Sequence, residues 1–239
     1  MSSKKQLFCF TYAGGTAAFF DDLDNDLSDV VVIKLEYSGH GVRHREALYN
    51  DFDELADDMY NSLKNNYSQG EYSLFGYSMG TISVVEVLNR IICKGEIPQP
   101  QNVFLAAHEP ITKEFSIDYT SKEADDWVKE RTIRFGTVPD KLIDNQSFWR
   151  TYLPLYKADY SIIGKYRFEN LKLKSYIPAT IFYSETDTRL KDMKLWHDIF
   201  IGKCEYHLFN GTHFFIKNHH SKMANIINNC MNGENVYDI

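Results

Sequence analysis

The sequence predicts an α/β fold in which a mostly parallel central sheet is flanked by helices, with a helical insertion at about residues 110–166. Two observations carry this prediction. Short apolar runs such as residues 30–35, nearly continuous and β-branched, alternate with segments whose apolar residues recur at helical spacing. Between residues 110 and 166 that alternation stops, and aromatic-rich helical patterns replace it.

The length of 239 residues fits a single domain spanning residues 1–239. A connection as long as residues 110–166 must have structure of its own, and a helical lid over the carboxyl edge of the sheet is the usual arrangement. We expect its helices near residues 127–128, 142–143 and 148–156. A separate helical domain is the alternative, but no linker rich in Gly, Ser or Pro isolates the segment.

Charge and composition exclude several classes of protein. The formal net charge of -7 disfavours a nucleic-acid binder, because phosphates require a basic surface. No run of about twenty apolar residues is present to span a membrane, and the apolar run near the start is too short for a signal peptide, so we expect a cytoplasmic protein. The four cysteines are widely separated, which suggests neither a disulfide scaffold nor a zinc site.

The first predicted elements are a buried strand at residues 7–11, a glycine loop at residues 12–16 and a helix. The loop is not a phosphate cradle, because the Gly-Lys-Ser/Thr ending of a P-loop is absent. The strand at residues 30–35 follows, and then His40 and His44. Histidines four apart can bind a metal on a helix, but the glycine between them and the lack of a third ligand nearby favour a loop.

A capping box predicts the start of a helix over residues 52–63. The next segment consists of an apolar run at residues 72–75, the turn Gly76-Tyr77-Ser78-Met79-Gly80, and a helix over residues 82–92 that is apolar around much of its circumference. A Gly-x-Ser-x-Gly turn in this context holds the serine in strained backbone with its hydroxyl exposed, while the glycines let strand and helix approach. We therefore predict that Ser78 is a nucleophile. Another buried strand is expected at residues 103–107.

A serine nucleophile needs a base to take its proton and an acid to orient that base. Asp187 follows the strand predicted at residues 177–184, and His213 follows the next one, at residues 205–209. Because parallel strands end at one edge of a sheet, both side chains can converge on Ser78. We predict a Ser78–His213–Asp187 triad.

Neighbouring residues are rivals for these roles. Glu185 and Asp192 are the rivals of Asp187, whereas the patterns around His207, His219 and His220 favour structural or surface positions. The oxyanion of the reaction needs backbone donors, normally the residue after the nucleophile and one in the loop after an early strand. Those positions are Met79 and Ala13. No metal site is predicted.

These residues resemble motifs of the type II thioesterases that accompany nonribosomal peptide and polyketide synthases, and the similarity covers most of the chain. The matching segments, with the family's motif in parentheses, are Tyr12-Ala13-Gly14-Gly15 (His-Ala-Gly-Gly), Gly39-His40-Gly41-Val42-Arg43 (Gly-Arg-Gly-x-Arg), Gly76-Tyr77-Ser78-Met79-Gly80 (Gly-His-Ser-Met-Gly), Lys157-Ala158-Asp159-Tyr160 (Arg-Ala-Asp-Phe), Thr186-Asp187 (the acid loop), and Gly211-Thr212-His213-Phe214-Phe215 (Gly-Gly-His-Phe-Phe).

The resemblance implies an α/β-hydrolase fold with a helical lid. It also implies an enzyme that hydrolyses stalled or misprimed acyl groups from the phosphopantetheine thioester of carrier proteins. Such an enzyme needs no cofactor of its own. Its partners would be acyl or peptidyl carrier domains that dock transiently, and we expect a monomer that binds neither nucleic acid nor membrane.

The sequence departs from the family at two positions that concern the substrate. Tyr12 and Tyr77 stand where histidines are common, so we expect both to flank the acyl site and make it bulkier. Thr11 and Ser38 replace prolines, and Gly164 replaces a frequent glutamate. Two other functions stay open: a small-molecule carboxylesterase or acyltransferase with the same triad, and a non-catalytic binding protein on a hydrolase scaffold.

Overall fold

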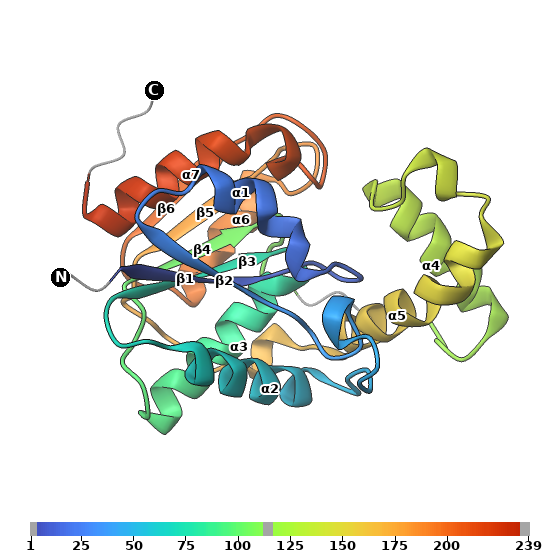
Figure 1. The fold of residues 1–239 in the computed structure, drawn as a ribbon, viewed down its shortest axis with the longest axis horizontal. Helices are drawn as coiled ribbons and strands as arrows, with labels where there is room; N and C mark the ends of the chain where they lie inside the picture. The colour runs from blue at the N-terminus through green and yellow to red at the C-terminus, as the bar shows by residue number, and fades with distance from the viewer. Residues whose placement is uncertain (1–3, 112–116, 235–239) are drawn as a thin grey trace.

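The computed structural model describes residues 4–111 and 117–234, and a parallel six-stranded sheet lies at its centre (Figure 1). The strand order is β2-β1-β3-β4-β5-β6, and every neighbouring pair is parallel. The predicted α/β class is therefore confirmed. The strands are β1 (Lys5–Phe10), β2 (Val30–Leu35), β3 (Tyr72–Tyr77), β4 (Asn102–Ala106), β5 (Ala179–Tyr183) and β6 (Cys204–Leu208).

Helices cover both faces of this sheet (Figure 1). On one face lie α1 (Asp21–Asp26) and α7 (Ile216–Asn232), and on the other lie α2 (Phe52–Asn66) and α3 (Met79–Lys94). Side chains of a strand alternate between the two faces. Leu74 accordingly packs in the core beneath α2 and α3, while Phe75 and Tyr77 pack in the core beneath α1 and α7.

Local capping sets the start of α2 as predicted. The Asp51 carboxylate accepts a hydrogen bond from the Glu54 N–H at 2.9 Å, which satisfies one of the unpaired donors of the first turn. The Glu54 carboxylate reaches back to the N–H of Asn50 rather than to that of Asp51. His40 and His44 flank a short 3₁₀ turn, η2 (Gly41–Arg43), so the predicted loop is confirmed.

Between β4 and β5 the chain forms a helical lobe that projects from the body (Figure 1). It contains α4 (Lys122–Phe135), η3 (Asp140–Leu142) and α5 (Gln146–Lys165), followed by η4 (Phe168–Asn170). The hydroxyl of Ser121 caps the start of α4, and the side chain of Asn145 caps α5, which continues through Pro154. We call this lobe the lid, because its side chains roof the cavity described below.

The remaining short helices are η1 (Ala17–Phe20), α6 (Leu190–Met193) and η5 (Lys194–Asp198). The strand order reverses between β1 and β3, since β1 pairs with β2 on one side and with β3 on the other. A crevice opens at such a point, outside the carboxyl ends of the strands, and ligands of open α/β sheets bind there. The loops that begin at Thr11 and Ser78 leave the sheet at this position.

Candidate active site

The turn between β3 and α3 has the geometry of a nucleophile elbow. Ser78 has φ 55° and ψ −117°, a combination that costs a non-glycine residue free energy. A Cβ added to Gly76 would lie 2.3 Å from the Gly80 carbonyl oxygen, and one added to Gly80 would lie 2.0 Å from the Phe10 carbonyl oxygen. Both contacts are with backbone, which cannot swing away. The pattern therefore requires glycine at both positions.

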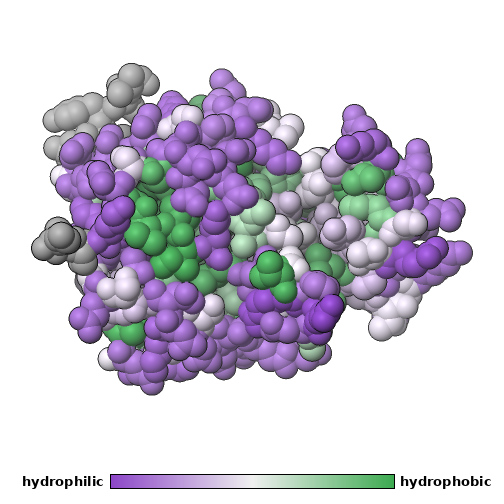
Figure 2. All heavy atoms as spheres, viewed as in Figure 1, coloured by the Kyte–Doolittle hydropathy of each residue, from purple (hydrophilic) through white to green (hydrophobic). Residues whose placement is uncertain are grey.

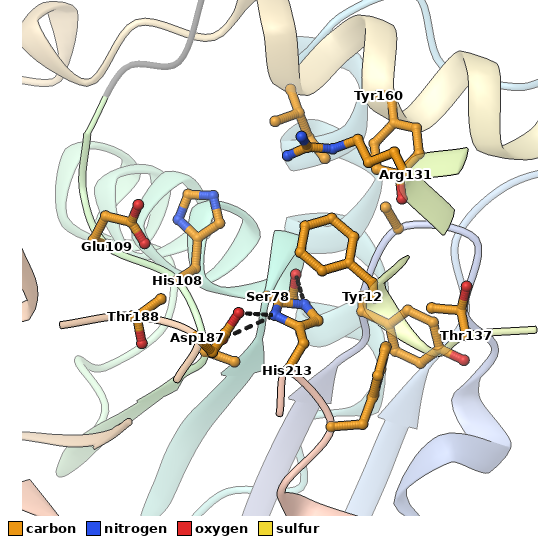
Figure 3. A pocket seen from close by; sticks show the side chains of 15 residues that line it. Tyr12, Ser78, His108, Glu109, Arg131, Thr137, Tyr160, Asp187, Thr188 and His213 are labelled. Carbon is orange, nitrogen blue, oxygen red and sulfur yellow. Dashed lines mark hydrogen bonds and ion pairs between the residues drawn. The ribbon is translucent and has the colours of Figure 1, made fainter. Parts of the chain in front are cut away.

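Ser78, His213 and Asp187 form a continuous hydrogen-bonded chain (Figure 3). The Ser78 Oγ lies 2.9 Å from His213 Nε2, and His213 Nδ1 lies 2.9 Å from both oxygens of Asp187. A carboxylate can only accept, so Nδ1 carries the proton and Nε2 is left to accept from the serine hydroxyl. The imidazole and the carboxylate are each 9% exposed, which keeps the pair in a medium of low dielectric.

The acid and the base sit on loops that are tied to each other. The hydroxyls of Ser184 and Thr186, in the loop after β5, both donate to the Gly211 carbonyl oxygen in the loop after β6. The Asp187 N–H donates to the Ser184 carbonyl oxygen at 2.9 Å and closes a tight turn. These bonds fix the separation of Asp187 and His213 without relying on the ion pair alone.

The predicted oxyanion donors lie on either side of the crevice. Met79 is the first residue of α3, so its N–H has no partner within the helix. In the loop after β1, the Gly14 N–H donates to Asp159 at 2.6 Å and the Gly15 N–H donates to the Tyr12 carbonyl oxygen at 2.9 Å. The N–H groups of Gly14 and Gly15 are thus already paired, which leaves the N–H of Ala13 to bind the substrate oxygen. Ala13 lines the cavity.

A cavity of about 110 Å³ opens beside the Ser78 hydroxyl (Figure 3). The body of the protein supplies its floor, which includes Ala107, a residue with φ 60°. The lid supplies its roof, with Arg131 and Tyr160 facing Ser78 from above (Figure 3). The lining residues are Tyr12, Ala13, Ser78, Ala107, His108, Glu109, Arg131, Phe135, Thr137, Tyr160, Ile163, Asp187, Thr188, His213 and Phe214.

The two tyrosines predicted to flank the acyl site have different positions. Tyr12 does line the cavity, with its ring packed edge-on against Phe19 and Phe214. Tyr77 does not, and that expectation is corrected. As the last residue of β3 it points into the core beneath α7, fully buried, and its hydroxyl donates to the His213 carbonyl oxygen at 2.7 Å. Tyr77 thus holds the histidine loop rather than the substrate.

Sequence reasoning missed the lid residues of the site. The Phe135 ring lies 4.5 Å from the His213 ring, between centroids, and covers it. Arg131 lies among the rings of Trp127, Phe135 and Tyr160 at 4.9–5.5 Å, and burial lowers the pKa of its guanidinium. The aromatic density of the insertion was the available signal, but helical periodicity alone cannot say which face of α4 turns toward Ser78.

Within residues 4–111 and 117–234, no three His, Cys, Asp or Glu side chains gather in a cluster that suits a metal ion. His40 and His44 point to separate partners: His40 Nε2 to Asp159, and His44 Nδ1 to the Gly41 carbonyl oxygen. None of the helices in the same ranges combines the length and the apolar character that a membrane crossing needs.

Comparisons with known proteins find relatives over most of the chain. The chain is 26% identical over 216 residues to the rat (Rattus norvegicus) medium-chain S-acyl fatty acid synthase thioesterase, covering 88% of this chain and 81% of that protein. It is 22% identical to the gramicidin S biosynthesis protein GrsT of Aneurinibacillus migulanus, over 90% of this chain and 84% of that protein. The crystal structure of ClbQ, from the colibactin NRPS/PKS pathway, superimposes with a TM-score of 0.86 at 23% identity, covering 97% of this chain and 98% of that one.

The family model described as "Thioesterase domain" matches residues 5–231, nearly the whole chain. The match includes the elbow, the acid loop, the histidine loop and the lid. This chain therefore belongs to the thioesterase domain family and is a hydrolase that acts on thioesters.

Proposed function

We propose that this protein removes acyl groups from the phosphopantetheine thioester of carrier proteins in nonribosomal peptide or polyketide synthesis, as a stand-alone editing thioesterase. The single observation that carries the proposal is the Ser78–His213–Asp187 chain at 2.9 Å spacing in a thioesterase-family domain. The names of GrsT and ClbQ, which place those proteins in synthase pathways, support the choice of pathway. The reaction uses only side-chain and backbone groups of this chain.

In the first half of the reaction, the Ser78 Oγ attacks the thioester carbonyl carbon while His213 Nε2 takes the hydroxyl proton. The developing oxyanion accepts hydrogen bonds from the N–H groups of Met79 and Ala13, and Asp187 stabilises the imidazolium. The C–S bond then breaks, and the imidazolium returns its proton to the leaving sulfur. The thiol of phosphopantetheine departs, and the acyl group stays on Ser78 as an ester.

In the second half, water takes the place of the thiol. His213 Nε2 removes one of its protons as its oxygen attacks the acyl carbon, and the same two N–H groups hold the second oxyanion. The ester bond breaks, and the imidazolium returns the proton to the Ser78 Oγ. The products are the free carboxylic acid and the original enzyme.

The size of the cavity favours short acyl groups. Its volume of about 110 Å³ is smaller than the roughly 150 Å³ of an engineered cavity that binds benzene. A medium-chain acyl group of about ten carbons has more heavy atoms than benzene. Release of medium-chain fatty acids, which the name of the rat relative suggests as a second function, would require the lid to move away from its present position.

The surface around the lid supports transient docking of a carrier protein. Figure 2 shows mostly weakly polar and some apolar residues at the junction between the body and the lid, a larger apolar patch on the body away from the lid, and hydrophilic residues over much of the rest of this face. Carrier domains are typically acidic, and this chain carries a net charge of -7, so long-range attraction cannot drive the encounter. Local apolar contact is the mode of docking that remains.

The decisive test is hydrolysis of acetyl groups from a loaded carrier protein by wild type, Ser78→Ala and the matched control Ser62→Ala. We expect Ser78→Ala to lose at least 10³-fold in rate, since it removes the nucleophile, and Ser62→Ala to match wild type. Clearance at the wild-type rate by Ser78→Ala would refute the mechanism.

The alternatives have their own readouts. A small-molecule carboxylesterase or acyltransferase would prefer an aryl ester, or an acceptor alcohol or amine, over the loaded carrier. A non-catalytic binding protein would fail to react with a fluorophosphonate probe, which labels an activated serine and here is expected to label Ser78.

A further inference from the structure

A second buried group of charged side chains lies apart from the triad, where the lid meets the loop after β1. Asp159 of α5 has a side chain only 3% exposed, and that of His40 is fully buried. The Oδ2 of Asp159 accepts a hydrogen bond from the Gly14 N–H at 2.6 Å and lies 3.0 Å from His40 Nε2. His40 Nδ1 lies 2.9 Å from the Ser38 carbonyl oxygen.

These contacts define the charge of His40. A carbonyl oxygen can only accept, so Nδ1 carries a proton, and Nε2 faces a carboxylate oxygen that also favours a proton. Burial lowers the pKa of His40, but the charge and hydrogen bond of Asp159, the Ser38 carbonyl and the charge of Glu36 outweigh it and raise the pKa above its ordinary value. The contacts of both ring nitrogens therefore favour the imidazolium over the neutral ring.

The other titratable groups around the pair do not change this assignment. Tyr37 packs edge-on against the His40 ring, and burial keeps its hydroxyl un-ionised. Tyr156 and Tyr160, on the same helix as Asp159, also have raised pKa values, that of Tyr156 to about 12, mainly through burial. Arg43, three residues along the chain from His40, is paired with the carboxylates of Glu46 and Asp58.

The pair acts on the segment that supplies an oxyanion donor. Gly14 directly follows Ala13, and α5 holds it from two adjacent turns. Asp159 binds its N–H, and Tyr156 packs so closely that a Cβ on Gly14 would lie 1.9 Å from the tyrosine ring. The direction of the Ala13 N–H therefore depends on the docking of the lid and on the Asp159 carboxylate.

We propose that His40 and Asp159 are positioning residues for the oxyanion hole, and that loss of the His40 proton at alkaline pH releases Gly14 and lowers kcat. Below the raised pKa of His40, an N–H points at Asp159 and the carboxylate is held toward Gly14. Above it, the neutral ring has one N–H for two acceptors, so a lone pair faces either the Ser38 carbonyl or the Asp159 carboxylate, and the positive charge that holds Asp159 is lost. The inference rests on the proposed roles of Ala13 and Ser78.

The family motif has arginine at the position of His40, so His40→Arg is the most informative variant. A guanidinium donates to Asp159 as the imidazolium does, but it does not titrate in the accessible pH range. In His40→Arg, kcat at neutral pH should stay within about threefold of wild type, and the alkaline decline should disappear. Asp159→Asn and His40→Gln should lower kcat by about tenfold or more, up to the roughly 10²–10³-fold loss that removal of an oxyanion donor causes. KM should change less than about threefold.

The assay measures kcat and KM for a soluble short-chain acyl thioester from pH 6 to pH 10. Lys157→Gln is the control, because Lys157 lies on the same helix but pairs with Asp125 at the surface of the lid. It should reproduce the wild-type profile. An unchanged alkaline decline in His40→Arg, or a wild-type kcat in Asp159→Asn, would overturn the proposal.

A measurement on the wild type covers the case in which a variant does not fold. In protein labelled with ¹⁵N-histidine, the two ring nitrogens of His40 should show the chemical shifts of an imidazolium at pH 7 and should titrate together with kcat on the alkaline side. A neutral ring at pH 7 would overturn the proposal. If Ser78→Ala were fully active the proposed function would fail instead, so the two failures are distinguishable.

Discussion

The hydrogen bond from Tyr77 to the histidine loop gives the most specific prediction. Tyr77→Phe keeps the ring, which stacks on Phe214 at 6.1 Å and contacts Phe215 at 5.7 Å, and removes only the hydroxyl. The lost bond is 2.7 Å long and buried, and a buried acceptor deprived of its donor costs about 1–3 kcal/mol. In a chain of this size we expect Tm to fall by about 2–12 °C.

The same bond fixes the backbone of His213, so the substitution should also slow the reaction. We expect kcat to fall by about tenfold, the equivalent of about 1.4 kcal/mol in the barrier, with KM unchanged because Tyr77 does not line the cavity. Urea unfolding gives the stability, and hydrolysis of a short-chain acyl thioester gives kcat and KM.

Tyr72→Phe is the matched control for this experiment. Tyr72 begins the strand that Tyr77 ends, and its hydroxyl also donates to a backbone carbonyl, that of Pro98, far from Ser78. It should lose stability with no change in kcat. If Tyr77→Phe behaved in the same way, with kcat within twofold of wild type, the positioning role of Tyr77 would be wrong.

Four further predictions concern the elbow, the pocket, charge and pH. Gly80→Ala should destabilise the protein by about 3 kcal/mol, because the added Cβ would lie 2.0 Å from a backbone oxygen. Gly95→Ala should destabilise it by about 1 kcal/mol, since only the positive φ of that residue opposes the change. Urea unfolding of both variants measures the two effects. The specificity constant should fall steadily from acetyl to decanoyl thioesters, and a preference for decanoyl would contradict the cavity volume. Salt should change KM for a loaded carrier by less than about threefold between 50 and 500 mM, because docking lacks long-range attraction; a large rise in KM would show the opposite. The pKa of His40 is raised in the folded state, so the protonated residue stabilises the protein fully at pH values below its unfolded pKa near 6.5. That stabilisation is lost as pH rises through the folded-state pKa. The free energy of unfolding should therefore decline between these two pKa values and above in wild type, but not in His40→Arg.

Those parts of the site that follow strand ends could be predicted from the sequence. Ser78 and Asp187 lie beyond the buried strands β3 and β5, and His213 follows the half-buried edge strand β6; a parallel sheet brings such positions to one edge. In the elbow, Gly76 meets the backbone of Gly80 four residues on, and Gly80 meets the Phe10 carbonyl oxygen of the neighbouring strand β1. Local pattern and sheet topology were therefore enough to predict that the three triad residues lie together.

Other parts depend on contacts that no local pattern encodes. Tyr77 was expected in the pocket because it precedes the nucleophile, but two-residue alternation puts it on the side of Phe75, in the core beneath α7. The contact between His40 and Asp159 joins residues 119 positions apart. The sequence placed His40 in a loop and in a family motif but gave it no partner, because Asp159 lies on a helix whose orientation the sequence does not give.

The backbone of Ala107 constrains how this enzyme can be redesigned. Its φ of 60° disfavours β-branched and bulky side chains, so the floor of the cavity cannot easily be raised by substitution there. Phe135, Tyr160 and Ile163, in contrast, lie on ordinary helices, where replacements meet no such backbone penalty. Engineering or natural divergence of acyl selectivity should therefore proceed through the lid, with the floor kept constant.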